Sequence, residues 1–154
     1  MIVIAVIAGA FVLLATVGIL AAIAIPNLLT AMQRSKQKRT MADIRAIATA
    51  VEAYGSEHRR YPEAASISEL ARELEPTHLK TPLVKDGWDH DLRYECWADD
   101  DPCDSYAIAS AGKDGLFEHE SLREYTPATV QDFDCDLVYA NGVFVTHPPT
   151  SSAP

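Results

Sequence analysis

The stretch that decides the fold is Gly18–Tyr54, "GILAAIAIPNLLTAMQRSKQKRTMADIRAIATAVEAY". Its first part is apolar on every side, whereas its second part repeats apolar residues at steps of three and four. Such a repeat is typical of a helix that buries one stripe. The stripe consists of Leu29, Met32, Met41, Ile44, Ile47, Val51 and Tyr54. The sequence therefore predicts one long helix from near Met1 to about Tyr54, with Gly55 as its stop and a bend at Pro26.

The N-terminal part of this helix has the composition of a membrane span. Residues 1–25 contain no charged side chain, and a helix of that length is roughly 37 Å long, enough to cross a ~30 Å hydrocarbon core. A cleaved signal peptide is the alternative, but it would need a basic segment before the apolar run. We therefore expect residues 1–26 to be a retained apolar half-helix. Residues 27–147 then form the amphipathic half and a globular domain.

Charge is distributed unevenly along the chain. Four of the 13 Lys and Arg residues lie in a basic collar at residues 34–39, and all 22 Asp and Glu residues follow Thr40. An acidic body argues against nucleic acid as a partner, because nucleic acid selects basic surfaces. Taken alone, a basic collar after the span would favour a cytoplasmic body.

The remainder of the chain reads as a small α+β domain. Ser66 and Glu69 form a capping-box pattern at the start of a short helix. Strands are expected at residues 92–97 and 105–110, and a hairpin formed by residues 135–140 and 143–147 is expected around Asn141-Gly142. The predicted fold is a long N-terminal helix on a small antiparallel sheet, followed by a disordered tail at residues 148–154.

The three cysteines allow one local disulfide. Cys96 and Cys103 flank a short acidic loop, so a bond between them is expected in an oxidising compartment. Three unlinked thiols are the alternative, and a Cys103–Cys135 bond also stays open. The spacing matches no common zinc-ligand pattern.

Three segments resemble one protein family. The helix from Gly18 to Tyr54 resembles that of type IV pilins and type II secretion pseudopilins. "TPLVKDGWDHDLRYE" (81–95) and "SAGKDGLFE" (110–118) resemble the major pseudopilin. The resemblance implies a structural subunit of a helical filament, built from copies of itself with other pseudopilins and an inner-membrane secretion platform. It also implies storage in membrane lipid, with the body on the periplasmic side of the bacterial inner membrane or in an extracellular filament.

The resemblance assigns a mechanical role to Gly18 and Pro26. In the family's filaments, the helix between the matching glycine and proline can lose hydrogen bonding. Proline lacks an N–H and glycine is a weak helix former, so the chemistry agrees with this role. We expect a continuous helix in lipid and, in a filament, a longer, bent helix that has lost hydrogen bonds between Gly18 and Pro26.

The resemblance implies calcium as a cofactor, bound in a loop of the globular domain. It points to Asp114 in the turn "AGKDGLFE". Glu118, Asp134 and Asp136 join the candidate set from composition and proximity, because calcium selects carboxylate and carbonyl oxygens of irregular loops. The alternative is that all four are solvated turn acids.

The N-terminus departs from the family pattern, and two other functions stay open. When the sequence is aligned on Pro26, the position of the family's glutamate falls on Gly9, and no leader cleavage site precedes it. That departure favours a non-polymerising, membrane-anchored binding module. A type IV pilin of a surface fibre is the other alternative.

An enzyme is not expected. Asp86, Asp89, His90 and Asp91 could suggest a metal hydrolase. No second cluster at a defined spacing accompanies them.

Overall fold

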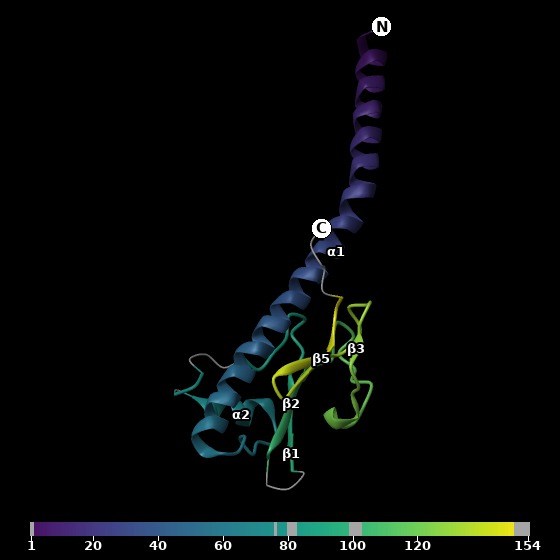
Figure 1. The fold of residues 1–154 in the computed structure, drawn as a ribbon. Helices are drawn as coiled ribbons and strands as arrows, with labels where there is room; N and C mark the ends of the chain where they lie inside the picture. Colours follow the sequence, from purple (N-terminus) through teal and green to yellow (C-terminus); the bar gives the residue numbers. More distant parts are fainter. Residues whose placement is uncertain (1, 76, 80–82, 99–102, 150–154) are drawn as a thin grey trace, which may run out of the picture. The chain divides into compact units, whose positions relative to one another are not determined.

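The computed structural model describes residues 2–75, 77–79, 83–98 and 103–149. The chain divides into two units, residues 1–35 and 36–154. Helix α1 (Ile2–His58) supplies the first unit and continues into the second (Figure 1). Most of the predicted tail, residues 150–154, lies outside the described residues.

The first unit is an apolar helix whose described side chains, from Leu13 onward, are almost all exposed. The most apolar 18-residue window of α1 has a mean hydropathy of 2.1, and none of it is buried. By length and composition this helix can cross a membrane. Pro26 lies inside the helix, and Thr30 Oγ1 donates to the Pro26 carbonyl at 3.0 Å.

The predicted end of α1 at Gly55 was wrong. The helix continues to His58. Arg59, which follows it, has a backbone φ of 60°, and its amide donates to the Gly55 carbonyl at 2.8 Å. Gly55 serves packing instead. A Cβ at this position would lie 2.8 Å from Cε1 of Tyr61, so the ring uses the space that glycine leaves.

The second unit contains one five-stranded sheet. Its order is β1-β2-β4-β5-β3, and the bounds are β1 Arg93–Trp97, β2 Ser105–Ser110, β3 Ala128–Thr129, β4 Leu137–Ala140 and β5 Val143–His147. All neighbours are antiparallel except β3, which pairs with β5 in parallel. The predicted strands and the Asn141-Gly142 hairpin are confirmed. The two-residue β3 was not predicted, because so short a segment carries no alternation to read.

The main core lies between the helices and one face of the sheet (Figure 1). Ile44, Ile47 and Val51 of α1 are at most 1% exposed, and they meet Tyr106 and Ile108 of β2. Helix α2 (Ile67–Leu74) adds Leu70 and Leu74 to the same core; its Ser66 cap accepts from the Glu69 amide at 3.2 Å. The prediction that the amphipathic half of α1 buries a stripe in the core is confirmed from Met41 to Tyr54, but Leu29 and Met32 of that stripe are 54% and 50% exposed.

The opposite face of the sheet carries a second, smaller core. Ala107 and Ala109 alternate with Tyr106 and Ile108 along β2, so they point to the other side. Leu122 of the 3₁₀ helix η1 (Leu122–Glu124) covers them. Ser121 and the Leu122 amide both donate to the Glu95 carboxylate, at 2.8 and 2.7 Å. The segment that follows β2 is thereby fixed onto the sheet.

Candidate functional site

The turn after β2 brings two distant segments into contact. Gly112 has a φ of +67°, and a Cβ there would lie 2.7 to 2.9 Å from the carbonyl oxygens of Phe133, Asp134 and Cys135. The Lys113 amide donates to the Phe133 carbonyl at 2.8 Å. Glycine is thus needed both for backbone conformation and for space. Backbone carbonyls and the candidate acids are therefore gathered at one end of the sheet.

Asp136 is the acid that this arrangement buries. It is 3% exposed, and its Oδ2 accepts from the Glu118 amide at 2.9 Å and from the Tyr125 hydroxyl. Its Oδ1 is buried and has no hydrogen-bond partner among the described residues. A buried carboxylate oxygen without a donor is unfavourable, so Oδ1 is open to a bound water or a cation.

Burial also raises the pKa of Asp136 above its ordinary value. The hydrogen bonds from Tyr125 and the Glu118 amide act in the opposite direction, whereas the negative charges of Glu118 and Asp114 raise the pKa further. A bound cation would favour the ionised form and satisfy Oδ1. Glu118 and Asp114 therefore lie close enough to Asp136 to act on its charge.

The other predicted ligands are engaged differently. Asp114 Oδ1 accepts from the Leu116 amide at 3.0 Å, and Asp134 Oδ1 pairs with Lys113 Nζ at 3.2 Å. Among the described residues, no group of three or more His, Cys, Asp or Glu side chains has a metal-binding arrangement. The four carboxylates are therefore not assembled around one point in this structure, and a cation here would depend on backbone carbonyls as well.

Sequence reasoning missed Tyr125 and Cys135 as neighbours of this site. Both line, with Glu118 and Asp136, a cavity of about 370 Å³. Tyr125 lies in a segment that gave no strand or helix signal. The contact between the Tyr125 hydroxyl and Asp136, 11 residues later in the chain, cannot be found from spacing alone.

Cys96 and Cys103 form a disulfide, with Cα atoms 5.1 Å apart, and Cys135 is a free, half-buried thiol. The bond closes the connection between β1 and β2. Cys103 also accepts a hydrogen bond at its carbonyl from the Tyr61 amide, at 2.9 Å. The same connection is therefore fixed to the segment that follows α1.

The segment "DGWDHD" is structural. Asp86 is 6% exposed and accepts from the Trp88 amide at 2.8 Å, the His90 amide at 3.0 Å and Ser110 Oγ at 2.7 Å. A carboxylate with three donors is a fixed framework element rather than a free base. The Gly87 amide next to it donates to Thr40 Oγ1 at 2.8 Å, which attaches the loop to α1.

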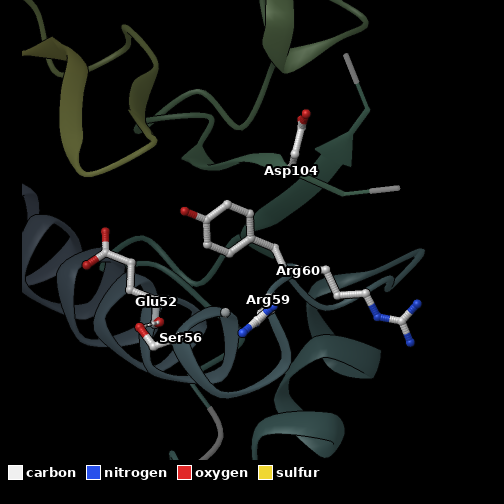
Figure 2. Close-up of a pocket in the computed structure, with 7 residues that line it drawn as sticks. Glu52, Ser56, Arg59, Arg60 and Asp104 are labelled. Atoms are coloured by element: carbon white, nitrogen blue, oxygen red, sulfur yellow. Dashed lines mark hydrogen bonds between the residues drawn. The ribbon is translucent and has the colours of Figure 1, made fainter. Parts of the chain in front are cut away.

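A second cavity, of about 410 Å³, lies at the C-terminal end of α1 (Figure 2). Glu52 and Asp104 lie on two sides of it, and the Arg60 side chain extends away from Glu52 (Figure 2). Glu52 Oε1 accepts from the Tyr106 hydroxyl at 2.9 Å, and burial together with this bond raises the pKa of Tyr106. Glu52 thus stabilises the core instead of acting as a catalytic base.

Comparison with protein-family models finds one family that matches most of the chain. The model of the family described as type II secretion system (T2SS), protein G matches residues 27–124. The chain belongs to this family. A comparison with curated proteins found no match.

Membership assigns the chain to a secretion system. It is a pseudopilin, a structural component rather than an enzyme, and it assembles with other pseudopilins of that system. The apolar half of α1 fits a single-pass anchor in the inner membrane. The matched residues include the amphipathic part of α1, β1, β2 and the Gly112 turn, but not Asp134 or Asp136.

Proposed function

We propose that this pseudopilin is the repeating subunit of a helical filament in type II protein secretion. One observation carries the proposal: the most apolar window of α1 is entirely unburied within its own chain. Such a helix must be covered by lipid or by other helices. Transfer from lipid to a bundle of identical helices replaces one apolar environment with another, so both states are accessible to the same subunit.

Gly18 and Pro26 give this helix the compliance that a filament requires. Pro26 cannot donate to the Ala22 carbonyl, and a Cβ at Gly18 would meet no atom within 4 Å. Gly18 is therefore not required by packing within the chain. We infer that both residues are there for the helix's own flexibility.

Calcium is proposed to stabilise the turn after β2. The orphan Oδ1 of Asp136 is its central ligand, Asp114 and Glu118 contribute negative charge, and carbonyls near Gly112 supply neutral oxygens. The Asp134–Lys113 pair lies at the edge of the same turn. A bound cation would neutralise like charges that the fold has placed together.

The body is proposed to lie on the periplasmic side of the membrane. The Cys96–Cys103 disulfide supports an oxidising compartment. The basic collar at residues 34–39 would then face anionic lipid headgroups or the acidic bodies of neighbouring subunits.

Electron microscopy of the purified, detergent-extracted chain tests the proposal. The chain should form thin helical filaments once detergent is diluted. Calcium at about 1 mM should increase the number of filaments, whereas magnesium at the same concentration should not. Asp136→Ala should remove the calcium effect and leave the magnesium control unchanged. Monodisperse particles under every condition would overturn filament formation and favour the anchored binding module. Filaments that ignore calcium would overturn only the calcium proposal.

A further inference from the structure

The turn after β2 presents one apolar side chain to solvent. Leu116 is 71% exposed, the highest value among the exposed large hydrophobic residues of the described chain. Its amide is fixed by Asp114 Oδ1 at 3.0 Å. The next residue, Phe117, points the other way, because the Arg93 guanidinium covers its ring at 3.8 Å. Leu116 is therefore held outward by a defined turn.

Acidic residues follow this leucine. Glu118 and Glu120 are both exposed, and no ion pair joins either one to another described residue. This segment therefore presents one apolar side chain and two carboxylates to solvent. We call residues 114–120 the acidic knob.

A groove of complementary character lies between α1 and the β4–β5 hairpin. It has a volume of about 590 Å³, and its apolar lining includes Met41, Val143 and Phe144. Val143 is 63% exposed, although it belongs to a strand. Lys38 and Arg45 supply two positive charges at the same groove, and the Arg45 guanidinium lies 5.0 Å from the Phe144 ring centroid. Neither cation has a salt bridge with another described residue.

We propose that the acidic knob of one subunit docks into this groove of a second copy. Leu116 would fill the space between Met41, Val143 and Phe144. Glu118 and Glu120 would face Lys38 and Arg45. Apolar burial at the centre with opposite charges at the rim is the arrangement that specific interfaces use.

The symmetry of this contact suits a polymer. The knob and the groove are different surfaces of one subunit, so the contact is heterologous and each subunit keeps one free knob and one free groove. Heterologous contacts that do not close into a ring produce open helical filaments. The inference rests on the proposed function, because it names the contact by which the bodies of a filament would meet.

Cysteine cross-linking tests the contact on the full chain. In a Cys135→Ser background, Leu116→Cys and Val143→Cys chains are co-produced and oxidised with a copper catalyst in detergent particles and in filaments. We expect a disulfide-linked dimer that contains one chain of each kind. Neither chain alone should give it. Ser68→Cys, an exposed position on α2, is the matched control, and with Val143→Cys it should give no dimer.

A second measurement uses assembly itself. Leu116→Asp should reduce the number of filaments by about tenfold or more, as expected for a buried contact residue, whereas Leu116→Met should retain them. Filaments that form normally with Leu116→Asp and give no 116–143 dimer would overturn the docking contact and leave the proposed function intact. A 116–143 dimer in particles that never form filaments would keep the contact and overturn the filament. Absence of both would overturn the two together.

Discussion

Gly87 lies directly against helix α1: a Cβ at this position would be 2.6 Å from the carbonyl oxygen of Lys36. The nearest obstacles are helix backbone atoms, which cannot rotate away. We therefore predict that Gly87→Ala lowers the free energy of unfolding by about 1–3 kcal/mol, as overpacking does in cores. Thermal unfolding followed by near-UV circular dichroism measures it.

The matched control for this substitution is Gly18→Ala, where an added Cβ meets no atom within 4 Å. It should leave the unfolding of the body unchanged. Equal melting temperatures for Gly87→Ala and the wild type would contradict the close approach of the loop and the helix.

Thr40 provides an independent test of the same docking. It is fully buried, and its Oγ1 accepts from the Gly87 amide at 2.8 Å while donating to the Lys36 carbonyl at 3.0 Å. Thr40→Val keeps the shape but leaves the Gly87 amide without its acceptor. It should lower the free energy of unfolding by about 1–3 kcal/mol.

Thr49 separates this effect from helix propensity. Its Oγ1 makes the same bond to the carbonyl four residues earlier, at 2.9 Å, but the side chain is exposed. Thr49→Val should therefore change the unfolding free energy by less than about 0.5 kcal/mol. If both variants unfold like the wild type, the Thr40–Gly87 bond contributes no stability.

The sequence predicted the elements of the fold better than their long-range contacts. The 3.6-residue repeat identified Ile44, Ile47 and Val51 as core, and Asn141-Gly142 identified the hairpin, because both signals are local. Gly87 and Thr40 are 47 residues apart in the chain, and neither has a pattern that points to the other. The candidate metal site follows the same rule. Asp136 was found from composition, but its burial depends on Tyr125, which no spacing indicated.

The disulfide should contribute measurably to stability. Cys96 and Cys103 are separated by seven positions, and closing a loop of that size in the unfolded chain is worth about 2–3 kcal/mol in the loop-entropy model. We expect reduction, or the double change Cys96→Ser with Cys103→Ser, to lower the free energy of unfolding by that amount and the melting temperature with it. Cys135→Ser is the control: it keeps the Cys96–Cys103 disulfide, so reductant should lower its melting temperature as it does in the wild type. A wild-type melting temperature that reductant does not alter would count against the disulfide.

The pH dependence of stability reports on Asp136. Its folded-state pKa is raised, mainly by burial, so the native state binds the proton more tightly than the unfolded state. The stabilisation from this group is fully present below the unfolded pKa of about 3.9. It is lost as the pH rises through the raised folded value, and at pH 7 without calcium the buried carboxylate destabilises the fold.

Asp136→Asn removes the negative charge of this side chain and keeps its hydrogen bonds, because the amide oxygen can still accept from Tyr125 and from the Glu118 amide. In the absence of calcium, the difference in unfolding free energy between the variant and the wild type should favour the variant more at pH 7 than at pH 4. Calcium at one hundred times its dissociation constant should stabilise only the wild type, by about 2.7 kcal/mol. Chemical unfolding at the two pH values, with and without the ion, measures both effects. A difference between the two proteins that is independent of pH would contradict the raised pKa.

Replacing Pro26 and Gly18 should stiffen the apolar part of helix α1. Replacement of Pro26 by Ala restores an N–H that can donate to the Ala22 carbonyl, and Gly18→Ala adds up to about 1 kcal/mol of helix propensity. The double variant should therefore keep residues 18–26 helical in both environments. Amide hydrogen exchange should be fast in this segment of wild-type filaments and slow in the variant, while both exchange slowly in detergent micelles. The variant should also form fewer filaments, because its helix resists stretching. If it assembles as well as the wild type and shows the same exchange, the glycine and the proline are not the source of the helix's compliance.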